Sequence, residues 1–247
     1  MIPISVKFAG IKVSLINREE IKEYLIQTVY EKSRFRVLFL DEWKMFASLF
    51  DKDLRQVIMS CDIVVCSSQT VAWMARMFTG KDVPVIQPVT IFLDFMRAAD
   101  EMNYSLFLFG GNRKVSAETV KRIRKSFQQS RILGSYQSHI TAKEMENVLT
   151  TIRKSSPQLF FASLGDQPKW EKWLSKQNPN FQSSIVAGLG NAFSIIAGKN
   201  KMPPIWFQEK GWNGFYTFLS RPYDLYRDFR VSVLFFMTLW KKITRKI

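Results

Sequence analysis

Three stretches of the chain share one order of features, in which an apolar run leads into a glycine turn and then into a helical segment. They are residues 106–128 with Gly110 and Gly111, residues 159–174 with Gly165, and residues 185–197 with Gly188 and Gly190. In an open α/β sheet such turns lie at the carboxyl ends of the strands, where ligands bind, and the following helix N–H groups favour anions. Three such turns indicate a phosphate-bearing ligand, although α/β proteins also use glycine in these turns for conformational reasons alone.

Apolar segments of strand length alternate with helical segments along most of the chain. The expected strands are residues 36–40, 62–66, 105–109, 131–136, 159–162 and 185–187, after a hairpin around Gly10. Strands that are apolar at nearly every position are typical of a parallel sheet covered by helices on both faces. We therefore predict a Rossmann-like α/β fold. The alternation stops near Gly198, which predicts an α/β domain at residues 1–198 and a basic, amphipathic helical appendage at residues 199–247.

The charge of the chain indicates an acidic partner. It carries 36 Lys and Arg against 21 Asp and Glu, a formal net charge of +15. In residues 221–247, seven basic and two acidic side chains surround the mostly apolar residues 231–240. This block is too short to cross a bilayer but suits the surface of an anionic membrane; the alternative is a helix packed on the core. Nucleic acid is disfavoured, because a long apolar block interrupts the charge and no nucleic-acid-binding module is recognised.

The few cysteine and histidine residues limit the expected metal and redox chemistry. Cys61 and Cys66 flank an expected strand and are too far apart to form a disulfide without a bend, so we predict buried thiols in a reducing compartment. His139 is the single histidine, so neither a zinc site nor a cofactor is expected. The N-terminus does not resemble a signal peptide and no apolar run is long enough to span a membrane, which predicts a cytosolic protein.

The order of the motifs is similar to that of the WecG/TagA/CpsF family of bacterial glycosyltransferases. CDIVVCSSQTVAWMARMFTG resembles the family's ADLVLPDGIGVVWASRLLG, SLGDQPKWEKW resembles GLGxPKQExW, and GLGNAFSIIAGKNKMPPIW resembles GVGGAFDFxAGxxxRAPxW. The resemblance implies transfer of an N-acetylmannosamine-type sugar from a UDP donor to a polyprenyl-diphosphate-linked saccharide in cell-surface polysaccharide assembly. It also implies a peripheral protein at the cytoplasmic face of the bacterial plasma membrane.

Several polar positions of the family differ in this chain. The aspartate taken as the family's catalytic base falls on Ser67, and the strand-end asparagine falls on Asp41. Other polar positions of the family fall on Phe39, Ile86, Trp170 and Met202. The glycines that shape the turns are retained, so the resemblance implies the fold and the site architecture more directly than it implies catalysis.

An inverting transfer needs a base that takes the proton of the acceptor hydroxyl while the donor's diphosphate leaves. The hydroxyl of Ser67 cannot do this alone, because its pKa is too high. We predict Asp41, at the end of the neighbouring strand, as the base and Glu171 as the second candidate. The alternatives are that Asp41 caps a helix and that Glu171 interacts with a helix dipole.

The resemblance also implies a nucleotide-sugar site on the glycine turns. We expect the diphosphate to lie on the N–H groups that follow Gly110-Gly111 and Gly188-Leu189-Gly190. Lys169, Arg221 or Arg227 would neutralise the leaving-group charge, and the two arginines could equally contact lipid phosphates. The side chains expected to contact sugar or uracil are Asn112, Gln167 and Asn191.

Two functions remain open beside the disfavoured nucleic-acid binder. The first is an active, divergent transferase that takes a UDP-sugar and a polyprenyl-diphosphate-linked acceptor and contacts an anionic membrane through residues 221–247. The second is a catalytically degenerate member that acts as a membrane-bound scaffold or as a partner subunit of a glycan-assembly enzyme. The joint loss of several family polar residues is what relaxed catalytic selection would leave in a member of the second kind. A homo-oligomer or a partner enzyme is compatible with both.

Overall fold

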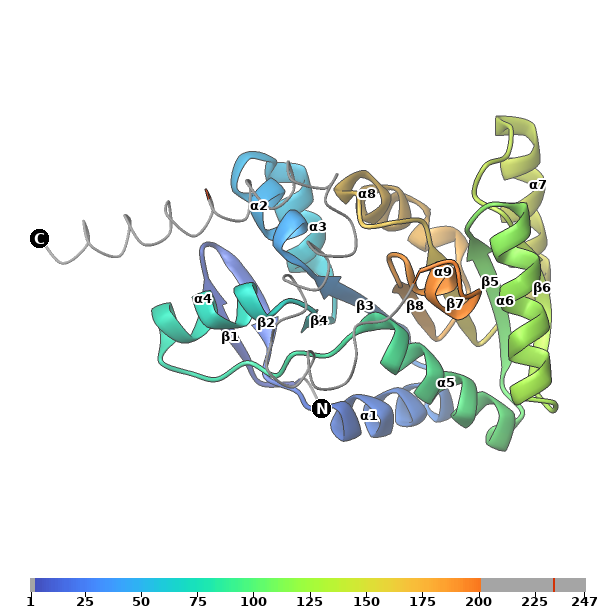
Figure 1. Cartoon of the computed structure of the whole chain (residues 1–247), viewed down its shortest axis with the longest axis horizontal. Coiled ribbons are helices and arrows are strands. Elements are labelled where there is room, and N and C mark those ends of the chain that lie inside the picture. Colours follow the sequence, from blue (N-terminus) through green and yellow to red (C-terminus); the bar gives the residue numbers. More distant parts are fainter. Residues whose placement is uncertain (1–2, 201–232, 234–247) are drawn as a thin grey trace, which may run out of the picture.

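The computed structural model describes residues 3–200 and residue 233 of the chain (Figure 1). The strands are β1 (Ser5–Phe8), β2 (Ile11–Ser14), β3 (Phe35–Leu40), β4 (Ile63–Cys66), β5 (Ser105–Gly110), β6 (Arg131–Tyr136), β7 (Leu159–Ser163) and β8 (Ile185–Gly188). The helices are α1 (Arg18–Tyr30), α2 (Glu42–Phe50), α3 (Lys52–Ser60), α4 (Gln69–Thr79), α5 (Pro88–Met102), α6 (Arg113–Ser126), α7 (Ala142–Ser155), α8 (Pro168–Gln177), η1 (Asn178–Asn180) and α9 (Ala192–Ile196).

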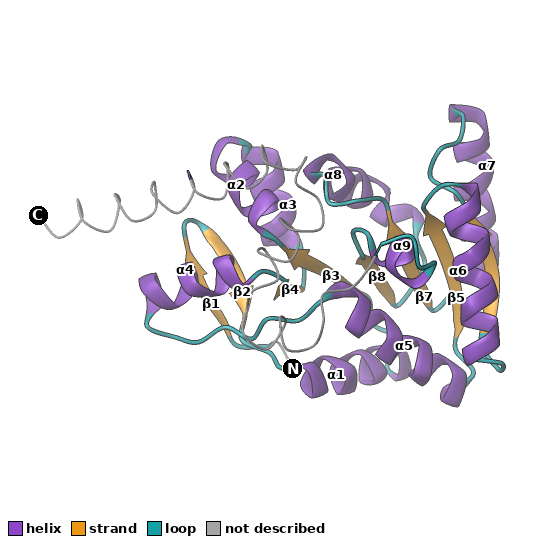
Figure 2. Cartoon of the chain, viewed as in Figure 1, coloured by secondary structure: helices purple, strands orange, loops and turns teal. Residues whose placement is uncertain are grey.

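Six of the strands form one parallel sheet in the order β4-β3-β8-β7-β5-β6, and β1 and β2 form a separate antiparallel hairpin. Parallel neighbours need crossover connections, and the intervening helices provide them on both sides of the sheet (Figure 2). The predicted Rossmann-like α/β fold is therefore confirmed. The predicted appendage at residues 199–247 lies almost entirely outside the described residues.

Local sequence signals explain where several helices begin. Asn17 and Glu20 form a capping box at the start of α1, and Thr141 and Glu144 form one at the start of α7. Pro168 occupies the first turn of α8, where a missing N–H is tolerated. In each case the residue types at the start of the helix account for the observed boundary.

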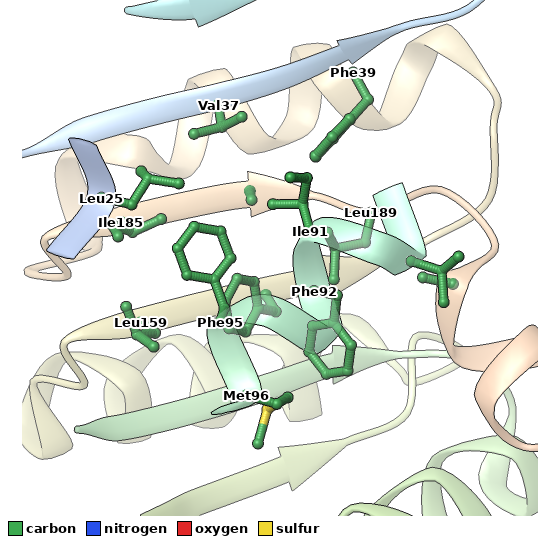
Figure 3. Packing of buried hydrophobic residues seen from close by; sticks show 14 of the residues in the cluster. Leu25, Val37, Phe39, Ile91, Phe92, Phe95, Met96, Leu159, Ile185 and Leu189 are labelled. Atoms are coloured by element: carbon green, nitrogen blue, oxygen red, sulfur yellow. The ribbon is translucent and has the colours of Figure 1, made fainter. Parts of the chain in front are cut away.

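One face of the sheet carries a single hydrophobic cluster with contributions from α1, α5, α6 and α9. Side chains from α5 pack against those of β3, β7 and β8 in its centre (Figure 3). Phe92 meets Phe161 edge to face, with the ring centroids 5.1 Å apart. This continuous apolar face holds the sheet against the helices, and on the same side the buried Asp94 of α5 pairs with the half-exposed Arg18 of α1.

The other face carries two hydrophobic clusters. The first joins the β1–β2 hairpin and helices α2, α3 and α4 to strands β3 and β4, and it contains the thiols of Cys61 and Cys66. Both thiols are free and buried, as predicted. The second joins α7 and α8 to strands β5, β7 and β8. The charged side chains of the site come from elements of both clusters.

Candidate active site

The carboxyl ends of the parallel strands bring the three predicted glycine turns together. The Gly111 N–H donates to the Ser163 carbonyl at 3.0 Å, and the Gly165 N–H donates to the Gly190 carbonyl at 3.1 Å. The Ser163 hydroxyl donates to the same Gly190 carbonyl at 2.7 Å and accepts from the Phe193 N–H at 3.2 Å. Turns far apart in the sequence therefore form one hydrogen-bonded edge.

Two of these glycines are required by close packing as well as by backbone conformation. Gly110 has a φ of +142°, and a Cβ there would overlap the Ser163 backbone. Gly190 has a φ of +53°, and a Cβ there would overlap the Asp166 carboxylate. Only glycine fits such positions without displacing its neighbours. The conformational explanation of these glycines therefore holds beside their predicted role in binding.

A buried lysine joins the two carboxylates predicted from the sequence. The Lys44 ammonium lies 3.3 Å from Asp41 Oδ2 and 3.3 Å from Glu171 Oε1, and it donates to the Phe39 carbonyl at 2.9 Å. Lys44 is only 2% exposed. Burial by itself lowers the pKa of the Lys44 ammonium, but the charges of Asp41, Glu171 and Asp166 outweigh burial and raise that pKa. The cluster therefore keeps a cation directly beneath the edge of the sheet.

The two predicted carboxylates differ in exposure. Asp41 caps α2, because its Oδ1 accepts from the Lys44 N–H at 2.8 Å, and its side chain remains 21% exposed. Glu171 is 4% exposed and its carboxylate also lies 3.9 Å from the Arg36 guanidinium. Arg36 in turn donates to the Glu171 carbonyl at 2.9 Å. Asp41 therefore reaches solvent at the edge of the sheet, whereas Glu171 is enclosed by cations.

Ser67 lies beside Asp41, as its position in the sequence predicts. Leu40 and Cys66, which precede these two residues, are register partners in the parallel β3–β4 pair. The Ser67 N–H donates to the Leu40 carbonyl at 3.0 Å, and the Ser67 carbonyl accepts from the Gln87 amide at 3.1 Å. The two strand ends are thus fixed next to one another.

The predicted amide contacts have different surroundings. Asn191 donates its side-chain amide to Asp166, and Asn112 caps α6 by accepting from the Val115 N–H at 2.9 Å. Gln167 is exposed at the start of α8, and the exposed Lys169 places its ammonium 5.0 Å from the Trp170 ring centroid. Neither Gln167 nor Lys169 joins the Lys44 cluster. Arg221 and Arg227 lie outside the described residues.

Lys44, Arg36 and Asp166 were not predicted as site residues. A signal for Lys44 was present, because a lysine three residues after a helix-capping aspartate lies on the same turn. The signal for Asp166 was its place between Gly165 and Gln167, in a glycine turn that follows β7 at the carboxyl edge of the sheet. Arg36 gave no signal, since a basic residue at the start of a strand is usually solvated.

Two findings concern possible cofactors and membrane spans. Among residues 3–200 and residue 233, no group of His, Cys, Asp and Glu is arranged to hold a metal ion. In the same part of the chain, no helix has the length and apolar character needed to cross a bilayer.

The fold and the site define a Rossmann-like α/β protein in which glycine turns converge at the carboxyl edge of the sheet. The chain belongs to the glycosyl transferase WecG/TagA/CpsF family, whose sequence profile matches residues 6–247. It is similar to the N-acetylglucosaminyldiphosphoundecaprenol N-acetyl-beta-D-mannosaminyltransferase of Bacillus spizizenii. The identity is 24% over 177 residues, which cover 72% of this chain and 68% of that protein.

Proposed function

We propose that this chain transfers an N-acetylhexosamine-type sugar, N-acetylmannosamine-like, from a UDP donor to a polyprenyl-diphosphate-linked saccharide in cell-surface polysaccharide biosynthesis. The observation that carries the proposal is the convergence of three glycine turns on Ser163 and Gly190, in a chain of this glycosyltransferase family. The activity named for the Bacillus relative supports the choice of donor sugar and acceptor.

Asp41 is the better candidate for the base. Its carboxylate is partly exposed at the edge of the sheet, beside Ser67, and its Oδ2 lies 3.3 Å from the Lys44 ammonium. In an inverting transfer, Asp41 takes the proton of the acceptor hydroxyl, this oxygen bonds to the anomeric carbon, and UDP leaves. Glu171 supports Asp41 indirectly, because it fixes the other side of the Lys44 ammonium.

The donor's diphosphate is proposed to lie on the N–H groups after Gly110-Gly111 and after Gly188-Leu189-Gly190. Oriented backbone donors can stabilise charge that develops on a leaving group. Lys169, Arg221 or Arg227 supplies the neutralising cation, and Asn112, Gln167 and Asn191 lie on loops from which they can contact sugar or uracil. Because the Asn191 side-chain amide donates a hydrogen bond to Asp166, the two side chains would contact the ligand together.

The first experiment is calorimetric titration of the protein with UDP, followed by a UDP-release assay in the same sample. The donors are UDP-N-acetylhexosamines, and the acceptor is a short-chain polyprenyl-diphosphate-N-acetylglucosamine. Binding together with acceptor-dependent release is the expected result. Absence of UDP binding would contradict the proposed site.

Matched carboxylate variants test the assignment of the base. Asp41→Asn is expected to lower kcat by about 100-fold or more, with UDP affinity retained. Glu171→Gln and Asp166→Asn are expected to lower it less, and the control Asp53→Asn, at an exposed position on α3, is expected to change nothing. Full loss in Asp166→Asn together with an active Asp41→Asn would overturn the assignment.

A second candidate function is a catalytically degenerate member that scaffolds a partner enzyme. It is favoured by the fact that both predicted carboxylates are bound by Lys44 and by the replacement of family polar residues at Ser67, Ile86 and Trp170. Two results together would favour this function. The unmodified protein would bind UDP without releasing it from any donor, and Asp41→Asn would bind UDP with unchanged affinity.

We also propose peripheral attachment to the cytoplasmic face of the plasma membrane through residues 221–247, which lie largely outside the described residues. The support is the basic and apolar pattern of that segment. Truncation after Pro222 is expected to abolish co-sedimentation with phosphatidylglycerol vesicles. Unchanged sedimentation of the truncated protein would contradict the attachment.

A further inference from the structure

Helix α6 and the edge strand β6 lie at one end of the sheet (Figure 1). A groove lies between them. Its lining residues from α6 are Arg113, Ser116, Ala117, Val120, Lys121 and Arg124. Its other wall is Ser135, Tyr136 and Gln137, at the end of β6. None of these residues belongs to the Lys44 cluster, and one of them, Arg113, begins α6 directly after the Gly110-Gly111 turn and its cap Asn112.

Small side chains create the hollow. Ser116 and Ala117 on α6 face β6, and the Ser116 hydroxyl lies 3.0 Å from the Ser135 hydroxyl. The register of β6 against β5 shifts between Leu106 and Phe107, so that Gly134 packs directly against the Phe107 ring. Such an irregularity at the edge of a sheet redirects the side chains that follow it. The groove is therefore a built feature of the α6–β6 contact.

Three cations line the groove on one stripe of α6. Arg113, Lys121 and Arg124 lie eight and then three residues apart, and all three are exposed. Their Cα atoms span about 16 Å along the helix at the usual rise per residue. Among the described residues, the only ion pair of α6 joins Arg122 to Glu118, so none of the three groove cations forms an ion pair there, although Lys121 also feels the charge of Glu118.

We propose that this groove binds a linear anion that carries two or more phosphoryl groups. Guanidinium groups at both ends match phosphate oxygens in pairs, and the groove length suits several phosphoryl groups in a row. The hydroxyls of Ser116 and Ser135 and the amide of Gln137 offer further donors to tetrahedral phosphate. A concave wall suits a discrete ligand rather than a flat membrane. This inference does not rest on the proposed transferase function.

The test compares two charge-matched variants of α6. Lys121→Gln with Arg124→Gln removes two cations from the groove, whereas Lys114→Gln with Lys125→Gln removes two exposed cations that do not line it. Calorimetry with inorganic tripolyphosphate, in saturating UDP to occupy the sheet edge, measures the affinity. The groove variant is expected to bind at least tenfold more weakly than the unmodified protein, and the control variant less than threefold more weakly.

Other outcomes decide against the groove. Equal weakening by both variants would assign tripolyphosphate binding to the general positive field of α6. Loss of all binding in saturating UDP would assign it to the sheet edge. Binding of phosphatidylglycerol vesicles that is weakened alike by the groove variant and by the control variant, with no tripolyphosphate affinity, would make α6 a membrane-facing surface. Binding of hexaglutamate as tight as that of tripolyphosphate would indicate an acidic peptide instead.

Two further measurements keep the result interpretable. Far-UV circular dichroism and urea unfolding confirm that each variant is folded. Ala117→Glu, at an exposed position on the wall of the groove, adds a negative charge without removing a cation and is expected to weaken tripolyphosphate binding at least tenfold. Unchanged affinity in Ala117→Glu would overturn the proposal.

Discussion

The two faces of the sheet are built differently. One face is a single hydrophobic cluster, whereas the other has two clusters, and buried charges connect the elements that form them. Arg36 and Lys44 come from β3 and α2, which contribute to the first of these two clusters, and Glu171 comes from α8, which contributes to the second. We call Arg36, Lys44 and Glu171 the ionic seam. Lys44 of the seam also contacts Asp41, so the seam positions the candidate base. Burying its charges costs free energy, and removing one partner should therefore destabilise the fold.

Removing the cation of the seam should have the largest effect. Lys44→Met is expected to lower the free energy of unfolding by about 3–5 kcal/mol, because it leaves the carboxylates of Asp41 and Glu171 without their shared partner. Urea unfolding at neutral pH measures the loss. Lys169→Met, at an exposed position, is the control and should change stability by no more than about 0.5 kcal/mol.

A double variant distinguishes a coupled seam from independent contacts. Lys44→Met combined with Glu171→Leu should lose less stability than the sum of the two single variants, because the uncompensated buried carboxylate is gone. Strict additivity would mean that Lys44 and Glu171 contribute to stability independently and do not form a coupled seam.

Features that repeat along the chain could be predicted from the sequence. Apolar strands alternating with helices predicted the parallel sheet, and the glycine turns predicted which loops meet at its edge. The proximity of Asp41 to Ser67 followed as well, since neighbouring parallel strands end at the same edge. In each case a pattern local to the chain was sufficient, because regular secondary structure carries that pattern into space.

The ionic seam could not be predicted, because it depends on tertiary packing between distant elements. Glu171 was expected to be a first-turn helix residue, and it is one, but the packing of α8 against α2 and α3 also buries it. Arg36 carries no signal that would mark it as buried, and the spacing of Lys44 from Asp41 indicates only that the two share a helical turn, not that Lys44 is buried. The partner that makes burial of such a charge tolerable lies more than a hundred residues away in the sequence.

The packing of the seam against the sheet predicts a smaller effect at Gly188. A Cβ at this position would lie 2.9 Å from Glu171 Oε1 and 3.0 Å from Leu174 Cδ1. Lys44 and Arg36 hold the carboxylate, so it cannot move aside, and Gly188→Ala should lower the free energy of unfolding by about 1–3 kcal/mol. Thermal and urea unfolding measure this change. In a Glu171→Ala background the same substitution should be less harmful, and an equal loss in both backgrounds would show that Glu171 is free to move.

The smallest effect concerns ionisation of the buried thiols Cys61 and Cys66, which lie in one of the two hydrophobic clusters on the same face as the ionic seam. Burial raises the pKa of the Cys61 and Cys66 thiols to about 12 each. Because the folded-state pKa lies above the unfolded value of about 8.5, the stabilisation from each neutral thiol is complete below that value and declines as pH rises toward 12. Each thiol should therefore remove about 1–2 kcal/mol of stability between pH 8 and pH 10.

Cys66→Ala isolates the contribution of one thiol. The loss of unfolding free energy between pH 8 and pH 10 is compared within each protein, so the cost of the substitution itself cancels. Urea unfolding at pH 8 and pH 10 should show a fall that is about 1–2 kcal/mol smaller in Cys66→Ala than in the unmodified protein. An identical fall in both would mean that a thiolate is tolerated inside the cluster. The expected result would show that this face accepts charge where Lys44 and Glu171 pair, and rejects an unpaired charge in the adjoining apolar cluster.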